Sequence, residues 1–329
     1  MIKFKDKQYK PVKMEVFTMS ELLIRLLPVC LLLVIGFLAK QIKLFSDPFI
    51  QELKVLIINI ALPAVLFDAF SKMTLQVSYL LLFVLIFIYC MLLYAIGYGL
   101  HRVFPGILKW SYTKGYMTGF EFGMIGVGLF GAIWGMDQLP VIMLIGFGHE
   151  LFIWFFYVIL ISKSPGKSFH LGETIGHFLK TPTIIAIVLG IVVNLTGIRP
   201  LMDETMIGQS LLAVIGFLKP LTSPLILIVI GYTMVFHRTH IRENVVYILS
   251  RNVLVLGIGT LFLVAIQYLV SGLEPIFAAA FYAFILLPAP YILPLYIRDE
   301  EESAFFTQLL VYSTAVSFIG YGILVVLYF

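Results

Sequence analysis

Residues 119–135 read Gly-Phe-Glu-Phe-Gly-Met-Ile-Gly-Val-Gly-Leu-Phe-Gly-Ala-Ile-Trp-Gly, and they decide how the fold is interpreted. The stretch lies in an apolar run long enough to cross a bilayer, yet it contains six glycines and one glutamate. Residues 126–131 also match the dinucleotide-binding fingerprint G-x-G-x-x-G. That fingerprint requires a preceding strand and a βαβ unit, whereas both flanks here are apolar helical segments. We therefore interpret the stretch as an interrupted membrane helix.

The composition is that of an integral membrane protein. Hydrophobic residues make up 61% of the 329-residue chain and charged residues 12%, whereas soluble proteins have about 45–50% apolar and about 25% charged residues. Lys and Arg are dispersed between apolar segments, which argues against nucleic-acid binding despite the net charge of +4. Cys30 and Cys90 have no metal-binding or redox spacing, so we expect neither a metal site nor a cofactor.

Ten apolar segments are long enough to span a bilayer, since one spanning helix requires about 20 residues. They cover residues 20–40, 49–70, 78–104, 115–136, 138–161, 181–198, 210–236, 244–270, 275–297 and 304–328. The predicted organisation is an N-terminal tail (1–19), a first set of five helices (20–161), a cytoplasmic linker (162–180) and a second set of five helices (181–329).

The distribution of basic residues predicts the orientation in the cell membrane. Cytoplasmic loops are enriched in Lys and Arg, and the loops after odd-numbered segments carry most of these residues. An even number of spans then places both termini on the extracellular side, although the five lysines within residues 1–13 do not follow this pattern. The basic residues counted as cytoplasmic are Lys40, Lys43, Lys54, Arg102, Lys109, Lys114, Lys163, Lys167, Lys180, Arg238, Arg242, Arg251 and Arg298.

The two halves of the chain share the spacing of their helix-breaking residues. Equivalent intervals run from Pro28 to Gly36 and Pro182 to Gly190, and from Pro63 to Gly126 and Pro224 to Pro288. Because five is an odd number, two tandem sets of five helices lie in opposite orientations. Inverted repeats with broken helices at matching positions are typical of transporters. Two half-helix N-termini meeting at mid-membrane, each with about +0.5 charge, would suit an anion.

Several motifs in this order resemble the auxin efflux carrier family of membrane transporters, in its bacterial permease branch. The resemblance covers essentially residues 20–329. Its motifs are Leu44-Phe-Ser-Asp47, residues 59–67 beginning with Asn59-Ile-Ala-Leu-Pro63, the glycine-rich stretch, residues 180–186 with Gly190, residues 223–231, Pro288-Ala289, and residues 313–317.

This resemblance implies an all-α membrane fold like that of sodium/proton antiporters and bile-acid symporters. In it, segments 115–136 and 275–297 are crossed broken helices, and two bundles move against each other in alternating access. It also implies a homodimer and a small organic anion, such as a carboxylate, as substrate. Many relatives have an asparagine before the first crossover and a proline within it, where this chain has Phe120-Glu121 and glycines. This departure and the short linker favour a small carboxylate over auxin.

Glu121 is the most informative candidate residue. A charged side chain at the bilayer centre costs about 2.5–3.5 kcal/mol, so this carboxyl group is expected to be protonated or paired. It either carries a proton or cation, or it is a structural hydrogen-bond donor. His149 and Glu150 form a second polar pair at depth, with either a coupling or a packing role. They lack the second histidine of a zinc protease motif.

The sequence thus predicts two sets of site residues and no catalytic or metal-binding residue. The coupling ion or proton is assigned to Glu121, His149 and Glu150. The substrate is assigned to Asn59, Pro63, Glu121, Gly123, Gly126, Gly128, Pro288, Ala289, Pro290, Ser313 and Thr314.

The leading hypothesis is a secondary transporter for small organic anions, and two alternatives remain open. One is a passive, channel-like anion pore, although no selectivity-filter motif is present. The other is a proton- or sodium-coupled cation antiporter of the same fold. An enzyme is not expected, since the sequence lacks G-x-S-x-G, H-E-x-x-H and Walker A motifs.

Overall fold

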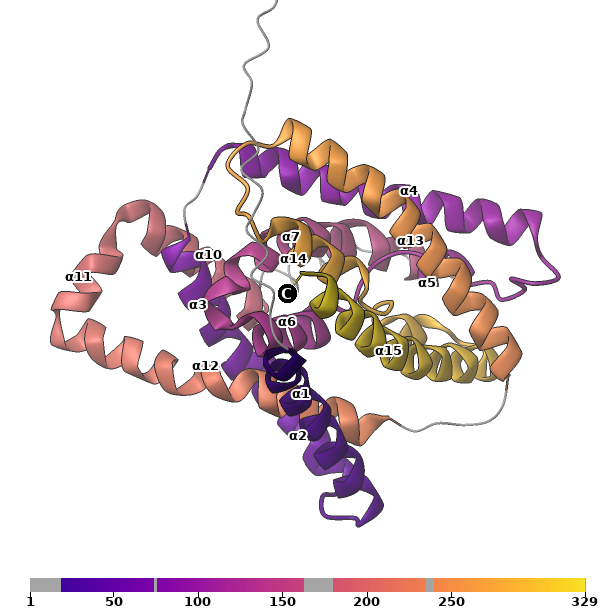
Figure 1. Ribbon diagram of the computed structural model, residues 1–329, viewed down its shortest axis with the longest axis horizontal. Coiled ribbons are helices and arrows are strands. Elements are labelled where there is room, and N and C mark those ends of the chain that lie inside the picture. Colours follow the sequence, from indigo (N-terminus) through magenta and orange to yellow (C-terminus); the bar gives the residue numbers. More distant parts are fainter. Residues whose placement is uncertain (1–18, 74–75, 163–179, 235–239, 329) are drawn as a thin grey trace, which may run out of the picture.

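The computed structural model describes residues 19–73, 76–162, 180–234 and 240–328, and every regular element within them is helical (Figure 1). The predicted tail (1–19) and linker (162–180) lie almost entirely outside the described residues. The elements are α1 (Met19–Gln41), α2 (Asp47–Leu56), η1 (Ile57–Ala61), α3 (Leu62–Lys72), α4 (Ser78–Val103), α5 (Thr113–Tyr116), η2 (Phe122–Gly126), α6 (Val127–Trp134), η3 (Met136–Gln138), α7 (Leu139–Phe152), η4 (Ile153–Tyr157), α8 (Val158–Ser162), α10 (Pro182–Thr196), α11 (Ile198–Glu204), α12 (Met206–Thr233), α13 (Ile241–Leu269), α14 (Phe277–Ile285), η5 (Leu293–Tyr296) and α15 (Glu300–Tyr328).

Six helical stretches in the described residues are long and apolar enough to cross a membrane, and a seventh is added if the bent pair α10–α11 counts as one span. The chain is therefore a multi-pass membrane protein. The six are Asp47–Lys72, Ser78–Val103, Met136–Ile161, Met206–Thr233, Ile241–Leu269 and Glu300–Tyr328.

Three of the ten expected segments are not counted among the six for a structural reason. Segments 115–136 and 275–297 are interrupted, so their helical pieces are individually short. The helix expected at 181–198 turns by 91° at Gly197, which has a φ of 66°, and continues as α11. The segment expected at 20–40 forms helix α1, Met19–Gln41.

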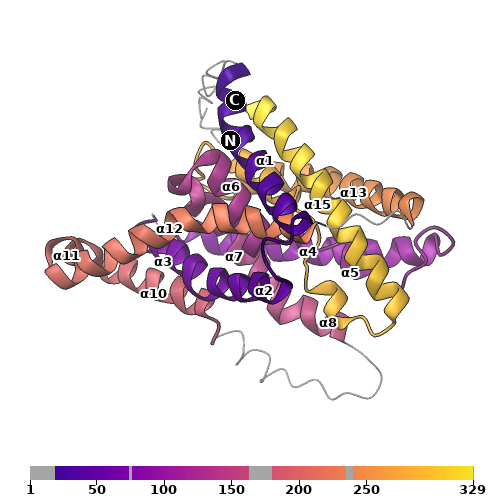
Figure 2. The same cartoon turned by 90° about the horizontal axis from the view of Figure 1, so that it is seen from below.

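Two long helix pairs join the halves of the chain. Helix α1 packs along α12, and α10 packs along α3 (Figures 1 and 2). Each pair approaches closely at a glycine. A Cβ on Gly36 of α1 would lie 2.0 Å from the carbonyl oxygen of Ile228, and one on Gly190 of α10 would lie 2.9 Å from that of Phe67. The two glycines that share a sequence position in the repeat pattern therefore make equivalent contacts.

The two interrupted segments meet at their breaks. Helix α5 ends at Tyr116 and η2 begins at Phe122, while α14 ends at Ile285 and η5 begins at Leu293. The backbone N–H of Glu121 donates to the carbonyl oxygen of Pro288 across the breaks, with an N–O distance of 2.9 Å. The interruptions are thus fixed to each other by main-chain atoms.

The first break lies before the glycine cluster rather than within it. Gly123 and Gly126 are part of η2, and Gly128 is part of α6. A Cβ on Gly128 would lie 2.8 Å from Ile226 of α12, so this glycine serves close helix packing. Only Gly119 lies in the break with a positive φ, 70°, and its Cβ would lie 2.7 Å from Pro290.

We expect Gly146→Ala to destabilise the fold by about 1–3 kcal/mol, because the added methyl group overpacks this contact. A Cβ at Gly146 would lie 2.1 Å from the ring of Phe122. The change in stability is measured by heating the protein with a thiol-reactive dye and following the labelling of the buried Cys90. All variants are made in a Cys30→Ser background, so that Cys90 is the thiol that reacts. Gly99→Ala in α4 is the matched control, since nothing lies within 4 Å of its Cβ position. Equal melting of the two variants would contradict the packing role.

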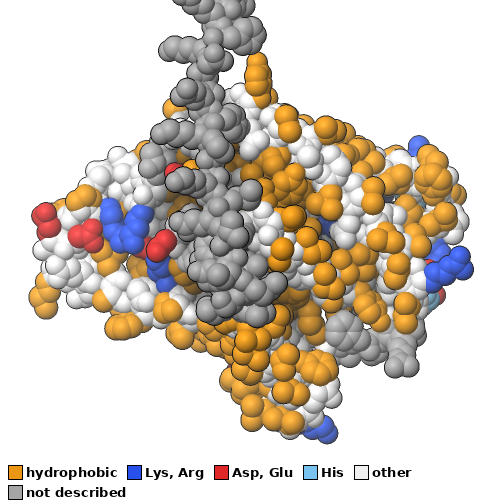
Figure 3. Space-filling model, in the orientation of Figure 1, with side chains coloured by type: hydrophobic (Ala, Val, Ile, Leu, Met, Phe, Trp, Pro, Cys, Tyr) orange, Lys and Arg blue, Asp and Glu red, His pale blue; other side chains and the backbone are white. Residues whose placement is uncertain are grey.

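The surface of the protein fits a lipid environment. Figure 3 shows hydrophobic side chains spread over most of the described face, with charged side chains mainly near its edges. Large apolar residues in the long helices are highly exposed, such as Phe217 at 76% and Val253 at 74%. Contiguous exposed apolar area of this kind marks contact with a membrane or a partner.

Candidate functional site

A buried arginine holds the two breaks together. The side chain of Arg251 in α13 is 2% exposed. Its Nη1 donates to the carbonyl oxygen of Tyr116 at 2.5 Å, and its Nη2 donates to those of Gly119 at 2.7 Å and Leu287 at 3.4 Å. These carbonyls lie at and just beyond the C-terminal ends of α5 and α14, where the helix dipole is negative. The guanidinium therefore satisfies three carbonyl oxygens at the two breaks.

This position corrects the expectation from the sequence, which counted Arg251 among the cytoplasmic cations of loops and adjacent helix ends. Arg251 is the eleventh residue of a 29-residue helix and is enclosed by protein. Its guanidinium also lies 5.1 Å from the centre of the Phe120 ring and 5.5 Å from that of Tyr116. Arg251 therefore cannot serve as a loop charge for the positive-inside rule.

His149 anchors the first break from the opposite side. Its Nε2 accepts the backbone N–H of Phe120 at 2.9 Å. Because this nitrogen is an acceptor, the ring is neutral and carries its proton on Nδ1. The Nδ1 lies 3.6 Å from Oε1 of Glu150. The geometry therefore favours a structural role for His149 over proton transfer.

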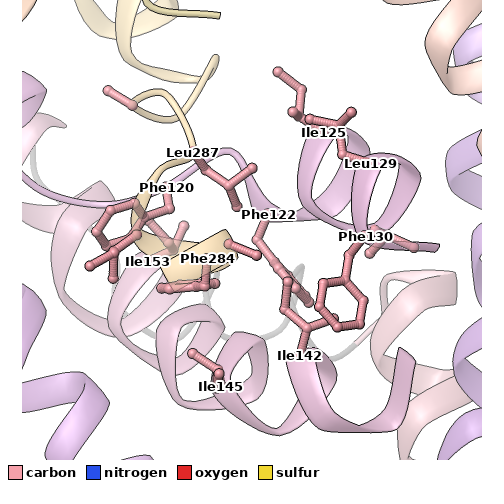
Figure 4. Packing of buried hydrophobic residues seen from close by; sticks show 14 of the residues in the cluster. Phe120, Phe122, Ile125, Leu129, Phe130, Ile142, Ile145, Ile153, Phe284 and Leu287 are labelled. Carbon is pink, nitrogen blue, oxygen red and sulfur yellow. The ribbon is translucent and has the colours of Figure 1, made fainter. Parts of the chain in front are cut away.

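The region below the crossing is filled by aromatic side chains. Figure 4 shows Phe120, Phe122 and Phe284 grouped with Leu287 above α7. The ring centres of Phe120 and Phe284 are 4.7 Å apart, and those of Phe122 and Phe284 are 5.9 Å apart. Residues from both interrupted segments thus share one apolar core, which fixes how the breaks lie relative to each other.

Glu121 links the two breaks through its side chain as well as its backbone. Its carboxylate accepts the backbone N–H of Tyr291 at 2.8 Å. The Tyr291 hydroxyl lies 2.6 Å from that of Thr314, which itself donates to the carbonyl oxygen of Leu310. Tyr291 is therefore the donor in the pair, and α15 supports the second break through Thr314.

A cavity of about 580 Å³ opens beside Glu121. Helices α2, α3 and α10 form one wall, and η2, α7 and Tyr291 form the other. Its volume lies within the range of about 300–1,000 Å³ that is usual for small-molecule sites. Four residues predicted from the sequence line it, namely Asn59, Glu121, Gly123 and Glu150.

The other predicted residues lie outside the lining. Pro288, Ala289 and Pro290 are buried in the second break, and Ser313 receives the hydroxyl of Tyr116, with an O–O distance of 2.7 Å. Their contacts support the crossing and do not reach the cavity. The predicted site residues absent from the lining are Pro63, Gly126, Gly128, His149, Pro288, Ala289, Pro290, Ser313 and Thr314.

Most residues that line the cavity were not predicted as site residues, and Lys54, Trp154 and Tyr291 are among them. Trp154 follows Glu150 by one helical turn, and its indole N–H donates to the Glu150 carboxylate at 2.9 Å. That spacing was visible in the sequence. Lys54 was counted only as a cytoplasmic charge, and nothing in the sequence places it beside Glu121.

A second charged cluster lies beside a smaller cavity of about 180 Å³. Asp68 of α3 is buried, and its carboxylate binds the ammonium groups of Lys219 from α12 and Lys72 from its own helix. Arg199 of α11 donates to it at 3.2 Å. One carboxylate therefore ties three helices together, and Lys219 is held by this contact.

Within the described residues, no group of three or more His, Cys, Asp or Glu side chains could hold a metal ion. Neither a family model nor a curated protein matches the chain.

Proposed function

We propose that the chain is a secondary membrane transporter for small organic solutes that carry a carboxylate, with the 580 Å³ cavity as its binding site. The observation that carries this proposal is the position of Lys54, Glu121 and Glu150 in an otherwise largely apolar cavity beside two interrupted helices. Charged residues at membrane depth mark substrate and ion pathways. Interrupted helices there supply the polar backbone groups of such sites.

The walls of the cavity support alternating access as the mechanism. The α2–α3 and α10 wall belongs to the unit formed by the α1–α12 and α10–α3 pairs, whereas η2, α7 and Tyr291 surround the crossing. Movement of one unit against the other would open the cavity on alternate sides.

We include in the proposal ten membrane crossings, two inverted repeats, extracellular termini, a homodimer and membership of the auxin efflux carrier family. The equivalent glycine contacts of α1 and α10 support the repeat.

Lys54 is the proposed counterion of the substrate carboxylate. Its side chain makes no hydrogen bond or salt bridge in the described part of the chain, although it interacts electrostatically with Glu121. A charge left unpaired in a confined apolar site is costly. A carboxylate ligand would remove that cost.

Counterflow in proteoliposomes tests the carrier. Vesicles are loaded with unlabelled L-malate, 3-phenylpropionate or L-phenylalanine, and uptake of the same labelled compound is followed. We expect saturable uptake of at least one compound, stimulated by the internal pool, and a loss of about tenfold or more in Lys54→Met. Lys72→Met is the control outside the cavity. A flux that rises linearly with concentration and is not stimulated from the other side would instead establish a passive pore.

A cation antiporter is the second candidate. Within the described residues, no charged basic side chain forms a salt bridge with Glu121 or Glu150, and the histidine beside Glu150, His149, is neutral. Sodium added to vesicles containing a pH-sensitive dye distinguishes the two. Proton release driven by sodium without any organic solute would favour the antiporter. Its absence, together with counterflow, would favour the organic carrier.

A further inference from the structure

The charges in the cavity specify more than a carboxylate, provided that the cavity is the substrate site of the proposed transporter. Among the described residues that line it, the charged side chains are one ammonium group, from Lys54, and two carboxylates, from Glu121 and Glu150. The other lining residues are mostly aliphatic or aromatic, with Phe70 and Phe147 among them. A ligand that carries both signs can therefore pair with charges of both signs in the cavity.

Within the described residues, neither carboxylate forms a salt bridge with a charged basic side chain. Glu121 accepts the N–H of Tyr291, and Glu150 accepts the indole N–H of Trp154. Both donors are neutral. His149 lies 3.6 Å from Glu150, but its ring is neutral because Nε2 accepts the N–H of Phe120. Both carboxylates thus remain able to bind a positive group.

Lys54 presents the opposite charge without a direct partner. It and Glu121 interact electrostatically while forming no salt bridge within the described residues. The two signs are therefore separated within one cavity. Asn59, which also lines the cavity, adds an amide that can donate a hydrogen bond to a carboxylate.

We propose that the ligand is a zwitterion with an apolar side chain, that is, an apolar amino acid or a close analogue. Its carboxylate binds Lys54 and Asn59, its ammonium group binds between Glu121 and Glu150, and its side chain lies against apolar residues of the lining. A simple anion leaves both carboxylates without a cation, and a simple cation leaves Lys54 without an anion. Unpaired charges in an apolar site oppose binding, so the zwitterion is selected against both.

Binding to the purified protein, measured by thermal shift and by radioligand competition, tests this selection with two matched sets of compounds. One set is L-phenylalanine, 3-phenylpropionate and 2-phenylethylamine. The other is L-leucine, 4-methylpentanoate and 3-methylbutylamine. We expect at least one amino acid to bind about tenfold or more tightly than its two analogues, since each analogue lacks one charge. Equal or tighter binding of the analogues in both sets, or no binding of either amino acid, overturns the proposal.

Charge-removing variants locate the two ends of the ligand. Lys54→Met should weaken binding of the amino acid about tenfold and leave binding of the amine unchanged or stronger. Glu150→Gln retains an oxygen for the Trp154 indole, and it should weaken the amino acid but not the deaminated acid. Lys72→Met, outside this cavity, should bind like the wild type. Wild-type affinity in both cavity variants overturns the assignment.

The experiments can refute the proposed transport activity and the proposed zwitterion site independently of each other. Counterflow of 3-phenylpropionate but not of L-phenylalanine would leave the carrier standing and overturn the zwitterion. Selective binding of the amino acid without trans-stimulated flux would support the zwitterion site and overturn the carrier.

Discussion

Replacing Arg251 with methionine is expected to lower the melting temperature on the order of 10 °C, the largest stability effect of any single side chain at the crossing. The substitution leaves the carbonyl oxygens of Tyr116, Gly119 and Leu287 without their donor. Each hydrogen bond from a charged group contributes about 1.5–3 kcal/mol. The site is enclosed by protein, so water cannot replace the guanidinium.

The test uses two controls, one at another arginine of the same helix and one at Arg251 itself. Arg242→Met removes an exposed charge near the start of α13 and should melt like the wild type. Arg251→Lys keeps the charge but has no planar fork, and it should be intermediate because one ammonium group reaches these carbonyls less well. Exposure of Cys90 reports the crossing directly, since Thr118 donates to the Cys90 carbonyl oxygen at 2.6 Å. Wild-type melting of Arg251→Met would show that the guanidinium does not hold the breaks.

Helix positions were largely predictable because hydropathy is a local property. Residues 78–104 and 304–328 were expected to span, and the structure has Ser78–Val103 and Glu300–Tyr328 as long apolar helices. Glycine and proline also marked both interrupted segments. The position of the first break was less predictable, because glycine permits either a turn or close packing. Gly119 forms a turn, whereas Gly128 allows close packing against Ile226 of α12.

The positions of Arg251 and Lys54 were not predicted because each depends on residues distant in the sequence. The sequence pattern gave Arg251 and Lys54 the same interpretation, as basic residues near helix ends. One is enclosed against carbonyls more than 30 residues away in the chain, and the other faces a cavity with Glu121. A single sequence carries no information on these pairings. Conversely, Asn59, Glu121 and Glu150 were predictable because polar groups are costly in membranes and usually functional.

Replacing Glu121 with glutamine is expected to leave the fold intact and to flatten the pH dependence of transport. The amide oxygen of glutamine can still accept the N–H of Tyr291, and the backbone N–H to Pro288 is unaffected. The substitution removes the negative charge of the carboxylate and, with it, the ability to gain and lose a proton. If protonation of this carboxyl group is part of the transport cycle, the ratio of the counterflow rates at acidic and alkaline pH should fall to about one.

The position of the carboxylate is the reason to expect coupling. Glu121 lines the cavity and also joins both breaks, so a change in its protonation acts on the ligand and on the crossing together. Glu150→Gln should have a similar or smaller effect on the pH profile, since Glu150 does not contact either break. Glu52→Gln, an exposed carboxylate on α2, is the control. An unchanged rate and an unchanged pH profile in Glu121→Gln would make the residue structural, and the carrier would then be a uniporter driven by the gradient of its own substrate.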